Sequence, residues 1–553
     1  MQLPIPRPLQ FSSLMADIEN GTIKIPQFQR DFVWDTKKSA SLIDSIVKGY
    51  PIGTFIFWKT KEELRSVKNI GGIALPETED GDYIEYVLDG QQRLTSLFAS
   101  MKGVQIQRDK KIEDFSLMYL DLDADESEQV VIHFQELVDI SNQRYIKLCD
   151  LLTGELTYLA SFSKERQKKI TYYKQRLEAY NYSTISVKEA PLDIATDIFT
   201  RINVGGKPLS LFEIMVAKTF DREKDFDLSE KFEEFTSTLE SVNYETISSA
   251  TGLQTVSLVL SGECTKKQIL KLKKEDIIDV WPKIVDSIET SVDYFRTYYR
   301  IPVSKLLPYN ALLAPFAYFF TKHKDRPTGE IQRLLQDFFW RCSLSERYSS
   351  AVESKLAQDV KKIDTILKAE RPKYDWSVDI STDYIEENGW FSAGRSYIKA
   401  LLCILTSKQP KSFVDGASVK VSNDWLKQAN SRNYHHFFPR AYLRKRKEEE
   451  EDINHILNIT IVDDFLNKKL IGAKAPSKYM TSFKEKNPEL QKHMKTHLIN
   501  DLDKFGIWED DYDTFWDKRA AAFSSELKKR IIIDEVDKNL KLAEVKDKAA
   551  EEC

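Results

Sequence analysis

Apolar and polar residues predict short helices and strands in alternation over the first 100 residues. Helices are expected at residues 11–20 and 37–48, the second because its apolar side chains recur every three or four positions. β-Branched and aromatic residues fill residues 54–58 and 83–88, which favours strands. Residues 94–101 return to a helical pattern. The chain is therefore predicted to open with a mixed α and β region.

The pattern changes along the rest of the chain. Residues 117–122 and 130–134 are again typical of strands. From about residue 150 to residue 400 the spacing is helical, with helices predicted at 164–180, 209–220, 266–296 and 332–347. The polar stretch 408–416, which contains Pro and Gly, indicates a boundary before a compact final unit at 425–530. After residue 535 the alternating charges predict a solvated helix.

Length and composition indicate a globular protein of several parts. At 553 residues the chain is predicted to form about three or four units, at roughly 150 residues per domain. Its 42% hydrophobic and 30% charged residues fit this class. We see no apolar run near the roughly 18 residues that a membrane helix needs. The first residues also lack the layout of a secretory signal. We therefore expect a cytoplasmic protein without a membrane partner.

Net charge and cysteine spacing limit the kinds of nucleic-acid surface, metal site and disulfide that we expect. A net charge of −5 argues against a uniformly basic surface for nucleic acid, although 81 Lys and Arg residues leave room for a local basic groove. No pair of cysteines has the CxxC spacing, so neither a zinc knuckle nor a disulfide framework is indicated. The five cysteines, which suit a reducing compartment, are Cys149, Cys264, Cys342, Cys403 and Cys553.

Two adjacent histidines are the first candidates for chemistry, because the chain has only seven histidines. Hydrolysis of a phosphodiester needs an activated water, a metal ion and fixed geometry, which a β-hairpin followed by a helix can supply. In such a site His435 would be a metal ligand and His436 the general base, since imidazole titrates near neutral pH. Asn458 would fix the hairpin or orient the base. Asn467 would face the metal from the helix.

Three residues close behind Asn467 suit a phosphate contact. Lys474, Ser477 and Tyr479 carry the ammonium and hydroxyl groups for it. The alternative interpretation is an ordinary polar turn, with both histidines preceding Pro439. The pair is therefore convincing only together with the motifs around it.

The stretch 433–480 resembles the His-Asn-His (HNH) nuclease domain of the GmrSD family, the modification-dependent type IV restriction enzymes. The matching blocks are His435–Pro439, Leu457–Ile459, Asn467 and Lys474–Tyr479. Leu457 stands where the family usually has Gly, so the local turn can differ. The resemblance implies a ββα-metal nuclease that uses Mg²⁺ or Mn²⁺.

The N-terminal part resembles the other half of the same family over about residues 1–220. The blocks that carry the resemblance are Ile25–Trp34, Tyr50–Trp58, Asp89–Thr95 and Ile198–Leu209. The third block, Asp-Gly-Gln-Gln-Arg-Leu-Thr, is the most specific. The resemblance implies a domain related to the ParB and sulfiredoxin fold that binds and hydrolyses a nucleoside triphosphate and senses modified DNA. A weaker block, Arg347–Ser349, leaves a buried arginine and a DNA contact equally open.

The physical chemistry of the third block agrees with an anion site. Asp89-Gly90 lies where a predicted strand meets a predicted helix, and the N–H groups and positive dipole of that helix point back at the junction. Arg93 would add a fork suited to phosphate. Gln91 and Gln92 could hold a water or a metal-bound phosphate, and Asp89 could carry Mg²⁺ or polarise the attacking water.

Two more residues, Gln29 and Arg30 of the first block, would reach the same cleft. The alternative interpretation is that Asp-Gly makes a turn and that Gln-Gln-Arg lies on a surface helix.

The sequence thus predicts an α+β chain with a ParB/sulfiredoxin-like N-terminal domain, a long helical middle and a C-terminal ββα-metal HNH domain. The expected domains are residues 1–220, 221–410 and 411–535, followed by a charged tail at 536–553. The expected function is a nucleotide-regulated DNA endonuclease of prokaryotic anti-phage defence, acting on modified phage DNA, with a homo-oligomer possible. A phosphorothioate-dependent nicking protein and a non-catalytic, nucleotide-gated DNA-binding regulator stay open as alternatives.

Overall fold

The chain folds into two compact units, Met1–Leu228 and Ser229–Cys553, in the computed structural model. The residues that the structure describes are 4–26, 29, 32–64, 69–70, 73–76, 78, 81–108, 111–125, 127–134, 143–202, 210–221, 223–421, 435–462 and 466–538, without the side chains of 69, 108, 111 and 467–469. None of the described helices combines the length and the apolar character that crossing a membrane requires.

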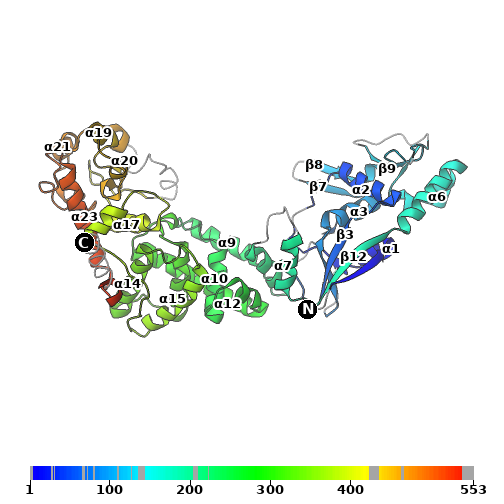
Figure 1. The fold of residues 1–553 in the computed structure, drawn as a ribbon, viewed down its shortest axis with the longest axis horizontal. Coiled ribbons are helices and arrows are strands. Elements are labelled where there is room, and N and C mark those ends of the chain that lie inside the picture. Colours follow the sequence, from blue (N-terminus) through cyan, green and yellow to red (C-terminus); the bar gives the residue numbers. More distant parts are fainter. Residues whose placement is uncertain are drawn as a thin grey trace, which may run out of the picture. The chain divides into compact units, whose positions relative to one another are not determined.

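A five-stranded sheet forms the centre of the first unit (Figure 1). Its order is β1 (Ile5–Gln10), β12 (Asn181–Lys188), β3 (Thr54–Thr60), β6 (Ile84–Asp89) and β2 (Ile23–Lys24). β1 and β12 are antiparallel, β12 and β3 parallel, β3 and β6 antiparallel, and β6 and β2 parallel. The two strands predicted at 54–58 and 83–88 are confirmed as neighbours in this sheet.

One strand of the sheet contradicts the sequence prediction of a helical region from residue 150 onward. β12 pairs with β3 from Ser183↔Thr54 to Lys188↔Lys59 and lies inside the sheet, not at its edge. Its residues Asn-Tyr-Ser-Thr-Ile-Ser-Val-Lys alternate in burial at first, as a strand does. The strand was missed because it follows directly on the predicted helix 164–180.

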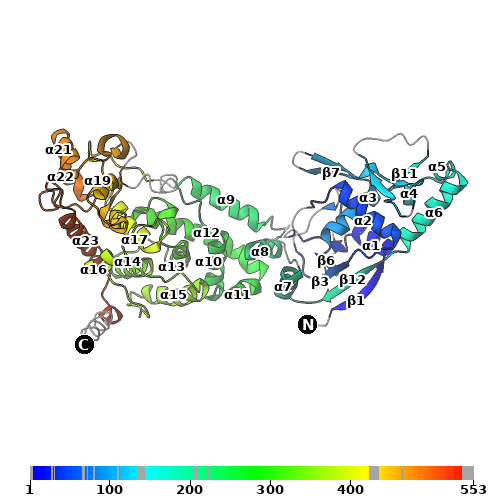
Figure 2. The same ribbon diagram turned by 45° about the horizontal axis from the view of Figure 1, so that its top comes forward.

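Both faces of this sheet are buried. Phe55 and Phe57 of β3 share a hydrophobic core with α1 (Phe11–Glu19), α2 (Thr36–Lys48) and α3 (Gln91–Lys102), which lie over one face (Figure 2). Trp58 points to the other face, where its indole Nε1 donates to the carbonyl of Ala190 at 2.9 Å. Neighbouring residues of a strand point to opposite faces. The apolar runs of β3 and β6 are therefore explained by burial on two sides.

The remaining elements of the first unit are smaller. A second sheet has the order β10–β9–β11. The elements are β4 (Asn69–Ile70), β5 (Ile73–Ala74), β7 (Gln105–Arg108), β8 (Lys111–Asp114), β9 (Met118–Asp121), β10 (Val131–His133), β11 (Tyr145–Lys147), α4 (Asp150–Thr153), α5 (Leu156–Ala160), α6 (Lys164–Glu178), α7 (Leu192–Ile202) and α8 (Leu211–Thr219). The ParB- or sulfiredoxin-like identity of this unit stays a prediction.

The second unit is mainly helical, as the sequence predicts for its first part. The helix predicted at 266–296 is two helices, because the chain is extended at Leu272 and Lys273. The helices are α9 (Leu228–Glu240), α10 (Ser249–Ser261), α11 (Lys266–Lys271), α12 (Lys274–Thr297), α13 (Leu313–Lys322), α14 (Gly329–Leu344), α15 (Val352–Ile366), α16 (Thr382–Asn388), α17 (Ser396–Ser407), α19 (Arg440–Lys445), α20 (Glu450–Ile453), α21 (Pro476–Lys486), α22 (Leu490–Lys495) and α23 (Tyr512–Lys528).

A two-stranded hairpin, β13 (His435–His436) with β14 (Ile459–Thr460), lies in the C-terminal part of the second unit. Phe437 and Phe438 follow it into a hydrophobic core that also contains Phe413, Tyr479 and Phe515. A helical turn at Leu466–Ile471 follows β14 in the chain. The division of the second unit into a helical middle and a separate HNH domain stays a prediction.

Candidate active site

The predicted histidine pair lies on β13 and faces β14 in an antiparallel register. His435 pairs with Thr460 and His436 with Ile459. The backbone N–H of Phe437 donates to the carbonyl of Asn458 at 2.8 Å and extends the pairing by one residue. The short hairpin therefore brings together three of the four residues that the sequence assigned to catalysis.

His435 is buried, with 1% of its surface exposed. Its Nδ1 lies 2.7 Å from the Thr460 hydroxyl, while its Nε2 is buried and has no hydrogen-bond partner among the described residues. Phe413, Phe437 and Tyr479 surround the ring. Burial lowers the pKa of His435 well below its usual value, with smaller contributions from His436 and His497. The ring is therefore neutral at physiological pH and keeps a lone pair on one nitrogen.

Asn458 joins the two ends of the hairpin. It is fully buried, and its Oδ1 accepts from the backbone N–H of Phe438 at 2.8 Å. Its Nδ2 donates to the carbonyls of Phe438 at 3.0 Å and Ile453 at 3.1 Å. An amide side chain that bonds both backbone groups of one residue fixes the backbone there. Asn458 thus holds the end of β13 against the segment before β14, and it precedes β14 by one residue.

His436 is the more accessible of the two histidines, with 8% of its surface exposed. Its Nε2 lies 3.1 Å from Oδ1 of Asn454. Asn454 was not among the residues that the sequence selected. No sequence signal marks it, because it lies in a polar stretch shared with many surface turns.

The described part of the chain offers few donors for a divalent cation at this hairpin. His435 Nε2 is a buried acceptor without a partner, which fits a metal ligand. The backbone places Asn467 in the turn Leu466–Ile471, and its side chain lies outside the described part of the chain. Among the described residues, no group of three or more His, Cys, Asp or Glu side chains could hold a metal ion. An imidazole with an amide suits Mn²⁺ better than the all-oxygen preference of Mg²⁺.

Two of the three predicted phosphate contacts need correction. Tyr479 is 1% exposed, and its hydroxyl donates to the carbonyl of Phe437 at 2.6 Å, so it packs under the hairpin instead of facing solvent. The hydroxyl of Ser477 donates to Asp510 at 2.7 Å. A carboxylate beside Ser477 would repel a phosphate. Lys474 is exposed and donates to the carbonyl of Leu470 at 2.9 Å.

Arg519 of α23 supports the hairpin and was missed in the sequence. Its guanidinium is fully buried and donates to the carbonyls of Leu457 at 3.0 Å and Ile459 at 2.6 Å, the two neighbours of Asn458. The side chain packs against the rings of Phe515 and Phe523. Only the tertiary structure brings this residue to the hairpin, because it lies about 60 positions later in the chain.

The first unit brings the three N-terminal sequence blocks together where β6 ends and α3 begins. The side chain of Gln29 donates to the carbonyl of Val87. The backbone N–H of Val33 donates to Oε1 of Gln92 at 2.8 Å. Arg93 reaches the second block at Ile52. The predicted convergence of Gln29, Gln92 and Arg93 is therefore seen, whereas Arg30 lies outside the described residues.

Arg93 links the two sides of this junction by hydrogen bonds, and its predicted role as a phosphate fork stays a prediction. Its Nη1 donates to the carbonyl of Ile52 at 2.7 Å, and its Nη2 donates to the carbonyl of Thr54 at 3.0 Å and to Asp89 at 2.9 Å. The side chain of Asp89 is 33% exposed. Gln91 and Gln92 are buried. Asp89 is thus an acidic group that this junction exposes, and Arg93 holds it in place.

The glycines of two blocks are required by the same packing. Gly90 has φ +97°, and a Cβ there would meet the ring of Phe55 at 2.4 Å. Gly53 has φ +88°, and a Cβ there would lie 2.5 Å from Nη1 of Arg93. Side chains rarely adopt such angles. Both glycines therefore leave the space that Arg93 and Phe55 need, so that the hydrogen bonds of Arg93 at this junction can form.

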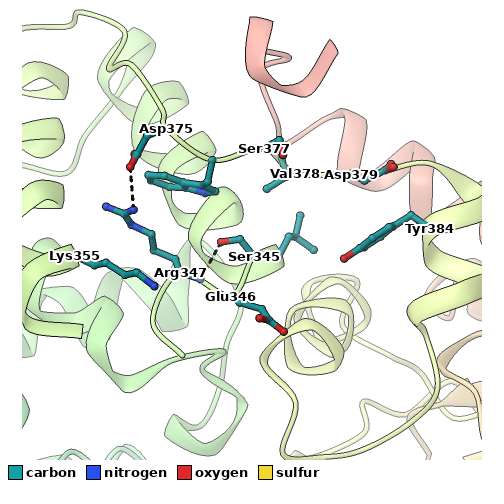
Figure 3. A pocket seen from close by; sticks show the side chains of 11 residues that line it. Ser345, Glu346, Arg347, Lys355, Asp375, Ser377, Val378, Asp379 and Tyr384 are labelled. Atoms are coloured by element: carbon teal, nitrogen blue, oxygen red, sulfur yellow. Dashed lines mark hydrogen bonds and ion pairs between the residues drawn. The ribbon is translucent and has the colours of Figure 1, made fainter. Parts of the chain in front are cut away.

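Arg347, the weaker sequence candidate, is a structural residue. Its guanidinium forms a two-point contact with Asp359, at 2.8 and 3.1 Å, and stacks on Trp376 at 4.0 Å. It lines a pocket of about 470 Å³ (Figure 3), where a dashed line joins it to Asp375 at 3.7 Å. None of the residues that line this pocket belongs to the hairpin. Arg347 is therefore buried, as one of the two interpretations has it, but its partner is the carboxylate of Asp359 within α15 (Val352–Ile366) and not the end of a helix.

Comparisons with known proteins agree with the N-terminal part of this picture. Residues 11–220 match the family model described as "GmrSD restriction endonuclease, N-terminal domain". The chain is also 25% identical over 546 residues to an uncharacterized protein of Methanocaldococcus jannaschii, a match that covers 88% of this chain and 91% of that protein. The first comparison supports the GmrSD-like resemblance and fits a restriction-type defence role. The second comparison shows that the similarity extends over most of both proteins and is not confined to the N-terminal part.

Proposed function

We propose that this protein is a metal-dependent DNA endonuclease of prokaryotic defence, with its cutting site on the β13–β14 hairpin and a nucleotide-binding site at the β6–α3 junction. The observation that carries the proposal is His435 Nε2, a buried ring nitrogen without a partner among the described residues, next to His436 on the same strand. The match of residues 11–220 to a restriction endonuclease domain supports the choice of DNA as substrate.

In the proposed reaction each residue of the hairpin has one task. His436 accepts a proton from the attacking water. His435 and Asn467 would hold Mn²⁺ or Mg²⁺, and such an ion supplies charge stabilisation at the phosphate when bound. Asn458 and Arg519 keep the hairpin backbone rigid, so that the base and the metal ligand keep their separation. A rigid hairpin matters because positioning accounts for a large part of such a barrier.

The first unit would bind a nucleoside triphosphate and sense modified DNA. Asp89 would carry Mg²⁺ or polarise the attacking water, since its carboxylate is partly exposed at the junction. The first turn of α3 favours a phosphate, because helix N-termini attract anions. Arg93 would act indirectly, by holding Asp89 in place.

One observation favours the non-catalytic alternative, a nucleotide-gated DNA-binding regulator. The described residues contain no group of three or more His, Cys, Asp or Glu side chains that could hold a metal. A nuclease that drew only on the described residues would depend on the phosphate and water to complete the metal shell. The alternative predicts DNA binding without any cleavage.

The experiment that tests the proposal uses three DNAs: unmodified, glucosylated hydroxymethylcytosine and phosphorothioate. Each is incubated with the full chain and Mn²⁺, with and without GTP or ATP. We expect cleavage of one modified DNA that changes on addition of one triphosphate, and loss of that change in Asp89→Ala. Binding without cleavage of all three DNAs would support the regulator instead. Cutting of only the phosphorothioate DNA would identify the nicking alternative.

A further inference from the structure

Asn454 connects the proposed general base to a distant part of the chain. Its Oδ1 lies 3.1 Å from Nε2 of His436, and its Nδ2 donates to the carbonyl of Phe391 at 3.2 Å. A backbone carbonyl only accepts hydrogen bonds, so the amide has one possible orientation, with its nitrogen toward Phe391 and its oxygen toward His436. The oxygen also only accepts. His436 must therefore donate through Nε2.

This donor sets the tautomer of the imidazole ring. A neutral histidine carries one N–H, and the other nitrogen bears the lone pair. With the hydrogen on Nε2, the lone pair of His436 lies on Nδ1. A general base needs its lone pair on the nitrogen that faces the proton it removes, so a fixed tautomer is part of its function.

The segment before α17 holds Asn454 in this position. The backbone N–H of Phe391 donates to the carbonyl of Asn454 at 2.7 Å, and the N–H of Ile456 donates to the carbonyl of Gly389 at 2.8 Å. Arg395 anchors the same turn, because its guanidinium donates to the carbonyl of Asn388 at 2.9 Å and stacks on Trp390 at 4.0 Å. Gly389 is required here, since a Cβ would lie 2.3 Å from the ring of His455.

We infer that Asn454 is a positioning residue that fixes His436 in the tautomer with its lone pair on Nδ1, and that the turn Asn388–Phe391 holds Asn454 for this purpose. The inference rests on the proposed function for its catalytic meaning. The proton of the attacking water passes to Nδ1 of His436 and the hydroxide attacks phosphorus, while the P–O bond to the leaving deoxyribose oxygen breaks and that oxygen takes a proton from solvent water. The imidazolium that forms keeps its Nε2 hydrogen bond to Asn454, whose amide stays neutral and exchanges no proton.

The first test reads the tautomer directly. Nitrogen-15 NMR of the full chain with labelled histidine distinguishes protonated from unprotonated ring nitrogens, and the signals of His436 are assigned from His436→Gln. We expect the hydrogen on Nε2 in the wild type and a mixture of tautomers in Asn454→Ala. A wild-type His436 with its hydrogen on Nδ1, or a tautomer unchanged in Asn454→Ala, would overturn the inference. This readout does not depend on any activity.

The second test uses cleavage kinetics and a matched control. Asn454→Ala should lower kcat about 10- to 100-fold with little change in KM, the usual effect of losing a residue that orients a ligand or base. In a His436→Ala background the same substitution should have no further effect, because its action passes through His436. Asn454→Asp should keep the tautomer and move the acidic limb of the pH profile upward, since a carboxylate stabilises the imidazolium.

Asn487→Ala is the control, because Asn487 makes the same kind of contacts elsewhere: its Nδ2 donates to the carbonyl of Phe413 at 2.8 Å and lies 2.9 Å from Nδ1 of His493. It should leave the pH profile and the His436 tautomer unchanged. An equal loss from Asn454→Ala with and without His436 would show a merely structural role. If no DNA is cut and His436 still carries its hydrogen on Nε2, the proposed function fails while the positioning by Asn454 stands.

Discussion

Three buried histidines should make the second unit sensitive to acid. His435, His455 and His497 are each at most 2% exposed. Burial lowers the pKa of His455 to about 3 and of His497 to about 4, and lowers that of His435 well below 6.5. The folded protein therefore binds these protons more weakly than the unfolded chain. The stability from these groups is complete above about pH 6.5 and is lost as the pH falls toward the folded values.

The loss can be estimated from the same pKa values. For His455 and His497, each pH unit below 6.5 costs roughly 1.4 kcal/mol, so each contributes a loss of about 2 kcal/mol at pH 5. These two histidines together give about 4 kcal/mol, close to the total stability of many domains, and His435 adds to the loss in the same direction. Geometry agrees for His455, because its Nδ1 accepts from the N–H of Leu457 at 3.2 Å and protonation would remove that acceptor.

Urea unfolding at pH 7.5 and pH 5 measures this effect. Trp516 reports locally by fluorescence, since its ring lies 4.2 Å from that of His455. Between pH 7.5 and pH 5, the free energy of unfolding of the His497→Asn variant should fall by about 2 kcal/mol less than that of the wild type. His323→Asn, which removes a half-buried histidine from α13's end, is the control and should lose as much as the wild type. Equal losses in His497→Asn and the wild type would refute the reasoning.

Three substitutions test other parts of the structure by urea or thermal unfolding. Asn458→Ala leaves three buried backbone groups without partners and should lower stability by at least about 3 kcal/mol; a loss under 1 kcal/mol would mean that the hairpin does not depend on it. Gly90→Ala should cost about 1 to 3 kcal/mol at a φ of +97°, and an unchanged midpoint would contradict the packing against Phe55. Asp537→Ala removes one of the two carboxylates that hold the fully buried Arg341, at 2.6 Å, and should cost about 3 to 5 kcal/mol; Asp534→Ala, on the same segment, should cost much less.

Local patterns predicted the elements around both sites. The strands at 54–58 and 83–88 and the helices at 37–48 and 94–101 are present, because β-branched runs and helical spacing depend on neighbouring residues. The strand β12 was missed, since only its pairing with β1 and β3 shows that it belongs inside the sheet. The tendency of a segment to form a strand depends on its neighbours in the sheet, which the local sequence does not show.

The candidate sites were predictable in position but not in detail. Sequence motifs found His435, His436, Asn458 and the Asp89–Arg93 block. They could not show that Arg93 donates to Ile52 and Thr54, because those carbonyls lie about 40 positions earlier in the chain. Tyr479 was predicted to face phosphate, yet its ring fills the core beneath the hairpin. The supporting residues Asn454 and Arg519 become visible only when distant segments meet.

Cleavage of DNA by the hairpin histidines is the central claim, and supercoiled plasmid with Mn²⁺ tests it most directly. The modified DNA that the wild type prefers is used as substrate. The account predicts that the wild type cuts and that His436→Ala is slower by about 100-fold or more, the usual contribution of a general base. His323→Ala should cut like the wild type. If the wild type and His436→Ala behave alike on every DNA, the histidine pair is not a nuclease site and the claim is contradicted.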